Sequence, residues 1–177
     1  MTQQQAISNH LDENIPRWFA VHTKYKSEKI VQRMLSQKKI NAYLPLQKYA
    51  RKYQRRVTSV ELPLISCYIF VNITKADYVK VLETEYVVGF VRFGKDLIAV
   101  PEQEITLLQR IINEDIDVFV EKSTFYEGDE VEIAVGNLMG LKGKLISVEG
   151  KNRMLVELEQ LGYTLQLSIE ANMLQKL

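Results

Sequence analysis

Few side chains of this 177-residue chain have the types and spacing that chemical catalysis needs. His10 and His22 are the two histidines, and neither lies beside a sequence motif for an activated nucleophile. Cys67 is the single cysteine, which excludes an internal disulfide and favours a small buried apolar role in a reducing compartment. One cysteine and two distant histidines do not make a metal-ligand set. The sequence therefore predicts a protein without enzymatic activity, cofactor or metal.

A glycine-rich run from Gly136 to Lys144 has the composition of a phosphate-binding loop. In such a loop the first glycine lies five positions before the glycine of the Gly-Lys pair, and a serine or threonine follows that pair. Here Leu138 takes the first of these positions and Leu145 the last. The run therefore predicts a turn and not a nucleotide site.

Basic side chains gather in two stretches of the chain. The first group is Lys24, Lys26 and Lys29, and the second is Lys48, Arg51, Lys52, Arg55 and Arg56, interleaved with Tyr49 and Tyr53. Clustered cations with interspersed aromatic rings attract a phosphate backbone and exposed bases. A solvated hairpin explains the second group equally well. The formal net charge is only +1, so any attraction to nucleic acid is local.

Three aromatic side chains, Tyr68, Phe70 and Phe90, fall on two expected strands. Alternate residues of a strand point to the same face of its sheet. Tyr68 and Phe70 are therefore expected to form one ledge, with Phe90 beside it. Such a ledge is either part of the core or a docking surface, and composition alone favours the core.

Hydrophobic periodicity predicts an α+β fold, in which helices pack on an antiparallel sheet. Strands are expected at residues 17–22, 42–53, 56–62, 68–73 and 87–93, and helices at 27–39, 75–84 and 101–112. Residues 1–16 are expected to be a polar leader, because they lack the apolar run of a signal peptide. No later segment approaches a membrane span, so a cytoplasmic protein is expected.

The pattern changes after residue 113. Residues 114–125 are acidic and lack helical spacing, which predicts a linker behind a first domain of residues 17–113. Short strands are expected at 130–135, 144–149, 154–158 and 163–168, separated by glycines. Such strands favour a small closed β-barrel over residues 126–177, because closure removes exposed edges.

Several of these segments resemble, in order, the N-terminal domain of NusG-type transcription elongation factors. They are Arg17-Trp18-Phe19-Ala20-Val21, Pro63-Leu64 leading into Tyr68-Ile69-Phe70-Val71, Phe90-Val91-Arg92-Phe93-Gly94, and Val100-Pro101. Gly128-Asp129-Glu130-Val131-Glu132-Ile133, Gly136 and Gly140-Leu141-Lys142-Gly143 resemble the KOW module of the same family. The segment at Phe90 is closer to specialised RfaH-like and UpxY-like antiterminators than to the general factor. Ile65-Ser66-Cys67 stands where members usually have Phe-Pro-Gly or Phe-Pro-Asn.

The resemblance implies a monomeric antitermination or elongation factor that binds the clamp helices of RNA polymerase. The matching docking positions are His22, Tyr68, Phe70 and Phe90, while Leu138, Met139 and Leu141 match the KOW loop that binds a small ribosomal subunit protein. Both basic groups would then face upstream or non-template DNA. The alternatives are a housekeeping NusG factor and a ribosome- or RNA-binding KOW protein without a polymerase role.

RfaH-like members can refold their KOW module into a helical hairpin. Here β-branched residues and the glycines between the strands disfavour a long helix, by about 1 kcal/mol for each glycine. The sequence therefore predicts a permanent barrel on a flexible tether.

Overall fold

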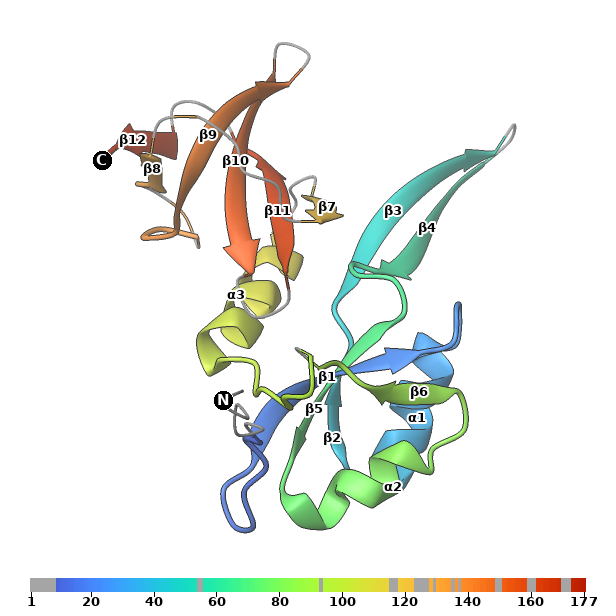
Figure 1. The fold of residues 1–177 in the computed structure, drawn as a ribbon. Coiled ribbons are helices and arrows are strands. Elements are labelled where there is room, and N and C mark those ends of the chain that lie inside the picture. The colour runs from blue at the N-terminus through green and yellow to red at the C-terminus, as the bar shows by residue number, and fades with distance from the viewer. Residues whose placement is uncertain are drawn as a thin grey trace, which may run out of the picture. The chain divides into compact units, whose positions relative to one another are not determined.

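The computed structural model describes residues 9–53, 56–92, 94–114, 118–122, 128, 130–134, 136, 138–148, 151–158, 162–169 and 173–177. The chain divides into two compact units, Met1–Glu102 and Gln103–Leu177 (Figure 1). The helices and antiparallel sheets of these units confirm the expected α+β class.

The first unit is built on a four-stranded antiparallel sheet with the order β2-β5-β1-β6. The strands are β1 (Arg17–Thr23), β2 (Asn41–Tyr43), β5 (Tyr68–Ile73) and β6 (Val87–Phe90), and the helices are α1 (Glu28–Gln37), η1 (Lys75–Asp77) and α2 (Tyr78–Leu82). Alternating apolar residues of the strands form one buried core with residues of α1 and α2, including Phe19, Val21, Val31, Leu35, Ile69, Val71 and Val81. The helices therefore cover one face of this sheet.

Two further strands, β3 (Leu46–Tyr53) and β4 (Arg56–Pro63), form a separate antiparallel arm of the first unit (Figure 1). One continuous strand was expected over 42–53, whereas the chain leaves the ladder between β2 and β3. Pro45 lies at this break and has no N–H for a strand ladder, while its carbonyl oxygen accepts the Leu64 N–H at 2.8 Å. The proline therefore marks the point at which the arm leaves the sheet.

The described part of the expected polar leader, residues 9–16, is bonded to the first unit. Asn9 bridges to Leu97, and the His10 N–H donates to the Leu97 carbonyl at 2.9 Å. The Lys75 N–H donates to the Asp12 carbonyl at 2.8 Å. Backbone hydrogen bonds therefore attach residues 9–12 to the first unit, although the polar composition of this segment did not predict such contacts.

The second unit carries a six-stranded antiparallel sheet with the order β12-β8-β9-β10-β11-β7. Its strands are β7 (Val118–Lys122), β8 (Glu130–Ile133), β9 (Lys142–Val148), β10 (Lys151–Leu158), β11 (Tyr163–Ser168) and β12 (Leu174–Lys176), and α3 (Glu102–Ile112) begins at the boundary between the units. The expected closed barrel is not found, because β12 and β7 are edges of the ladder among the described residues. β7 forms the hydrogen bonds along one edge of β11. In a closed barrel, another strand of the barrel would have to pair with that edge.

β7 lies inside the segment 114–125 that was expected to be a linker. Its five residues pair in register with β11, from Lys122 opposite Tyr163 to Val118 opposite Leu167. The side chains of Val118 and Leu167 are both buried. The interpretation of the whole segment as a linker is therefore wrong, because pairing with a distant strand outweighs its acidic composition.

The helices of the described residues are short. The longest is α3, with 11 residues. No helix in the described ranges combines the length and the apolar composition needed to span a membrane.

Candidate docking and nucleic-acid surfaces

The strand register decides which aromatic side chains share a face of the first sheet. His22 of β1 lies opposite Tyr68 of β5, and Val21 lies opposite Phe90 of β6. Residues directly opposite each other point to the same face, and neighbours along a strand point to opposite faces. His22, Tyr68 and Phe70 therefore share one face, as expected, whereas Phe90 points to the other.

Phe90 belongs to the core beneath the helices. Its ring stacks on Tyr78 of α2, with centroids 4.7 Å apart and planes at 16°, and meets the edge of Phe19 at 6.1 Å. Only 8% of Phe90 is exposed. The expectation that Phe90 extends the ledge of Tyr68 and Phe70 is therefore wrong, because β6 aligns it with Val21.

Phe70 lies within a buried aromatic group on the face of the sheet that carries His22 and Tyr68. It is 0% exposed and stacks on Tyr43, with ring centroids 6.4 Å apart. The ring of Trp18 meets Tyr43 edge-on at 6.5 Å. Burial raises the pKa of the Tyr43 hydroxyl to about 12. Phe70 is thus an interior side chain in this structure and presents no free surface.

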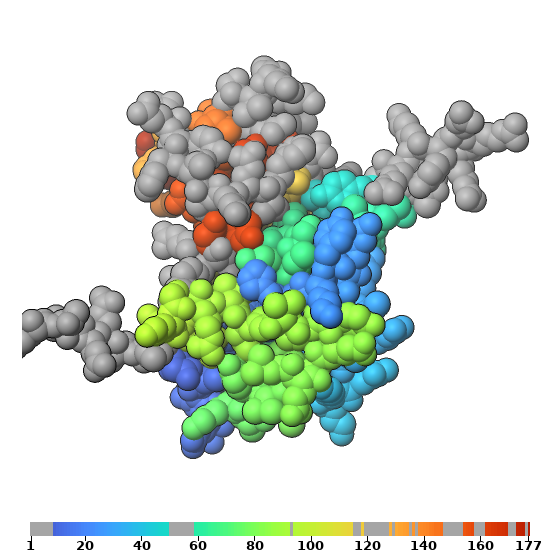
Figure 2. Space-filling model, turned by 45° about the vertical axis from the view of Figure 1, so that its right-hand side comes forward, coloured from blue at the N-terminus to red at the C-terminus, as the bar shows by residue number. Residues whose placement is uncertain are grey.

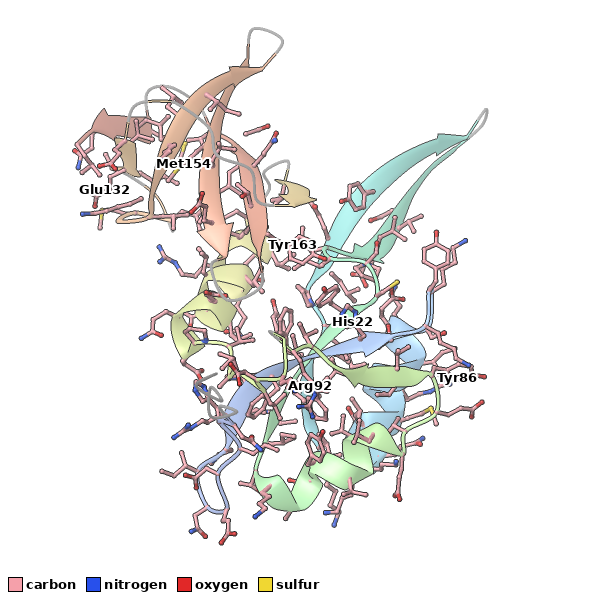
Figure 3. The ribbon with its side chains drawn as sticks, viewed as in Figure 1. His22, Tyr86, Arg92, Glu132, Met154 and Tyr163 are labelled. Atoms are coloured by element: carbon pink, nitrogen blue, oxygen red, sulfur yellow. The ribbon has the colours of Figure 1, made fainter. Side chains whose placement is uncertain are left out.

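His22 and Tyr68 are the half-buried pair on this face. Their ring centroids are 4.4 Å apart, and His22 lies near the base of the β3–β4 arm (Figure 3). Burial lowers the pKa of His22, and a hydrogen bond with the backbone of Cys67 opposes this effect in part. A neutral imidazole therefore packs against the tyrosine ring at neutral pH.

Acidification is expected to destabilise the first unit through His22. The unfolded chain binds a proton near the ordinary histidine pKa of about 6.5, before the folded chain does. Stability from this group is therefore full above that pH and declines as the pH falls toward the lowered folded-state pKa. Melting temperatures between about pH 7.5 and about pH 5.5 should fall more for the wild type than for His22→Gln. An equal decline in both proteins would contradict this role.

The turn before Tyr68 is held on both sides of Cys67. Cys67 has a φ of 64°, in the left-handed region that non-glycine residues rarely adopt. Its N–H donates to Glu28 Oε1 at 2.7 Å, and its carbonyl accepts the Thr23 N–H at 2.9 Å. The sequence alone does not indicate this role of Glu28, because an acidic residue in the first turn of a helix is already explained by the helix dipole.

The first basic group surrounds the loop between β1 and α1. Lys24 and Lys26 are exposed, with their Nζ atoms 5.9 Å and 5.2 Å from the ring centroids of Tyr86 and Tyr25. The Lys24 N–H donates to the Tyr86 carbonyl at 2.8 Å, and Figure 2 shows the blue loop surface beside the yellow-green surface that precedes β6. Lys29 instead donates to the Glu61 carbonyl at 2.8 Å.

The second basic group follows the arm. Lys48 is exposed on β3. The backbones of Arg51 and Lys52 lie in β3 and that of Arg56 in β4, while their side chains and the whole of Arg55 lie outside the described residues. The expected antiparallel hairpin is confirmed in its backbone, with Tyr53 opposite Arg56 nearest the tip.

The loop between β8 and β9 presents only part of its expected apolar surface. Met139 is 62% exposed and Leu141 is half-buried, whereas Leu138 is buried. The Gly140 N–H donates to the Ile133 carbonyl at 2.9 Å, which folds the loop back on β8. Arg110 of α3 donates from Nη2 to the Met139 carbonyl at 3.1 Å. Leu138 is therefore a packing residue, and Met139 is the most exposed member of the predicted loop site.

Residues 16–109, more than half of the chain, match a protein-family model described as "Transcription termination factor nusG". The chain belongs to the NusG family. This match confirms the resemblance at the level of the family. A search of the curated proteins gives no match.

Solved NusG and Spt5 structures are similar to this chain. "Domain interaction in Thermotoga maritima NusG" has a TM-score of 0.60 and 20% identity, and the match covers 92% of this chain and 97% of that chain. Conformations A and B of the MjSpt4:Spt5 complex each have a TM-score of 0.33 and 21% identity over 90% of this chain, and 97% and 96% of those chains. The Thermotoga structure shows a shared fold.

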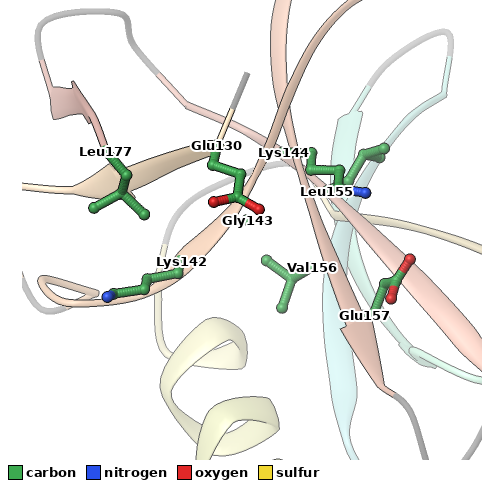
Figure 4. A pocket seen from close by; sticks show the side chains of 8 residues that line it. All are labelled: Glu130, Lys142, Gly143, Lys144, Leu155, Val156, Glu157 and Leu177. Carbon is green, nitrogen blue, oxygen red and sulfur yellow. The ribbon is translucent and has the colours of Figure 1, made fainter. Parts of the chain in front are cut away.

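One cavity of about 330 Å³ lies in the second unit, between β8, β9, β10 and the last residue (Figure 4). It is lined by Glu130, Lys142, Gly143, Lys144, Leu155, Val156, Glu157 and Leu177. Its charged residues come from three strands and carry both signs, and the sequence alone did not indicate that they line a common cavity. Among the residues that the structure describes, no three His, Cys, Asp or Glu side chains gather as a metal site.

Proposed function

We propose that this NusG-family protein binds the clamp helices of RNA polymerase and makes elongation more processive, with no enzymatic activity of its own. The observation that carries the proposal is the half-buried pair of His22 and Tyr68 on the sheet face opposite α1 and α2. Rigid aromatic side chains are common anchors of protein interfaces. Phe90 is not part of the proposed docking site, because its side chain belongs to the core.

The specialised antiterminator role is part of the same proposal. It is supported by the sequence from Phe90 to Gly94, which resembles RfaH-like and UpxY-like paralogues. A housekeeping factor and a ribosome- or RNA-binding protein without a polymerase role are the alternatives. Transcription with purified polymerase on a terminator-bearing template separates the three. Only an antiterminator extends transcripts past the terminator, a housekeeping factor changes the elongation rate without read-through, and a protein without a polymerase role changes neither.

The second unit is proposed to be a KOW module that binds a small ribosomal subunit protein. Met139 and Leu141 remain as its contact residues, since Leu138 is buried. A monomer in the cytoplasm, without cofactor, metal or membrane partner, completes the proposal.

Replacing Tyr68 with alanine is expected to weaken polymerase binding. Loss of an anchor at the centre of an interface costs about 2 kcal/mol, which corresponds to a roughly 30-fold higher Kd. The Kd for core polymerase should be measured at a temperature at which circular dichroism shows both proteins folded. Val88→Ala is the control, because it removes a 67% exposed apolar side chain from β6. Unchanged affinity of Tyr68→Ala would remove Tyr68 from the docking site.

We also propose that the basic groups face DNA in the transcription complex: Lys24, Lys26, Lys48, Arg51, Lys52, Arg55 and Arg56. Replacing Lys24 and Lys26 with glutamine should then lower the slope of log Kd against log salt by about 1.5, since each neutralised phosphate contributes about 0.7 to 0.9. The measurement is binding to an elongation complex at several salt concentrations. Lys75→Gln is the control, because Lys75 is exposed and paired with Glu13 at 3.3 Å. An unchanged slope would show that Lys24 and Lys26 do not contact DNA phosphates and are only solvated surface residues.

A further inference from the structure

The first turn of α1 is bonded both to the end of β4 and to the turn that precedes β5. Lys29 Nζ donates to the Glu61 carbonyl at 2.8 Å, and Glu28 Oε1 accepts the Cys67 N–H at 2.7 Å. Glu28 is only 4% exposed, although carboxylates are rarely buried without a partner. A buried carboxyl group thus holds the backbone of one turn.

The backbone of this turn depends on such contacts. Cys67 has a φ of 64°, a conformation that a non-glycine residue does not favour on its own. Cys67 is neither glycine nor asparagine, the two residues that adopt this conformation more readily. The chain therefore needs an external group that holds Cys67 in place.

The conformation of Cys67 decides the direction of the next residue. Tyr68 begins β5, and its ring lies 4.4 Å from that of His22. If Cys67 relaxed to an extended conformation, the peptide before Tyr68 would turn and the tyrosine ring would leave His22. The side chain of Glu28 therefore influences the position of the Tyr68 ring indirectly. It bonds to the backbone of Cys67, and the next peptide leads to Tyr68.

We propose that Glu28 is a positioning residue for docking: its carboxylate holds Cys67 in the left-handed conformation and so orients Tyr68 against His22. The inference rests on the proposed function for the identity of the partner. A role in the helix dipole alone does not explain the geometry. An acidic group can interact with the dipole while exposed, whereas Glu28 is buried and bonded to a residue 39 positions away.

The first measurement is amide hydrogen exchange at Cys67 in the full-length protein, and it does not involve polymerase. Glu28→Ala should raise the exchange rate by about 10-fold or more, because the N–H loses its acceptor. Glu28→Gln should stay close to the wild type, because its side-chain oxygen can still accept. Glu83→Ala, at an exposed glutamate after α2, is the control. Equal protection in Glu28→Ala and the wild type would overturn the proposal.

The second measurement is the Kd for core RNA polymerase. Glu28→Ala should bind about 10-fold more weakly, a shift of about 1.4 kcal/mol, while Glu28→Gln binds like the wild type. Cys67→Gly in the Glu28→Ala protein should recover affinity, because glycine adopts positive φ without strain. An equal loss of affinity in Glu28→Ala and Glu28→Gln would overturn the positioning role, because it would indicate that the carboxylate contacts the polymerase directly. Faster exchange with unchanged affinity would overturn it as well.

Two further results remain decisive. If Glu28→Ala does not fold, Glu28→Thr replaces it, because threonine is too short to reach Cys67, and the expected outcomes stay the same. If the wild type does not bind polymerase, the proposed function fails and the docking role of Glu28 with it. The exchange measurement then still decides whether Glu28 orders the turn.

Discussion

Gly143→Ala is expected to destabilise the second unit by roughly 3 kcal/mol, because the new methyl group has no space. A Cβ on Gly143 would overlap the carbonyl oxygen of Leu155 and lie 2.8 Å from the Cε of Met154. The carbonyl belongs to the backbone of β10, which is paired with β9 and β11 and cannot move aside easily. Urea unfolding followed by circular dichroism measures the loss.

Gly162→Ala is the matched control for this prediction. Gly162 has a φ of 67°, and a Cβ there would meet no atom within 4 Å. Only the backbone strain of alanine remains, which costs about 1 kcal/mol. If the two variants unfolded at the same urea concentration, close packing at Gly143 would not be the cause.

Phe90→Ala is expected to lower the free energy of unfolding of the first unit by about 3 to 5 kcal/mol. The ring fills a space between Tyr78 and Phe19 under the helices, and its removal leaves a cavity. Polymerase binding should fall only in proportion to the folded fraction, in contrast to Tyr68→Ala. The two quantities should be measured on the same samples, by urea unfolding and by Kd. A folded Phe90→Ala protein with a selective loss of affinity would place Phe90 back in the docking site.

The sequence predicts most strands of the first unit but not how they align. Alternation within β5 correctly puts Tyr68 and Phe70 on one face. The face of Phe90 depends on the pairing of β6 with β1, which shifts register between His22 and Thr23. A shift of one residue reverses the face of every later side chain, and no local pattern reports it.

Long-range pairing also explains the other differences. The acidic residues around Val118 indicate a linker when read alone, and only β11 shows that they form a strand. The Cys67 N–H likewise finds its acceptor 39 residues away, in Glu28. Composition and periodicity depend only on residues that are close together in the sequence. They therefore do not predict which distant segments contact each other.

The length of the β3–β4 arm separates two kinds of interaction. Each strand has eight residues, so the arm reaches about 27 Å at roughly 3.4 Å per residue. Electrostatic interactions in physiological salt decay over about 8 Å, so charges near the tip have little influence on His22 and Tyr68 at the base. Changes to the arm and to the docking pair should therefore have additive effects. Such independence would allow evolution to alter the proposed contact with DNA without altering the proposed binding of a protein partner.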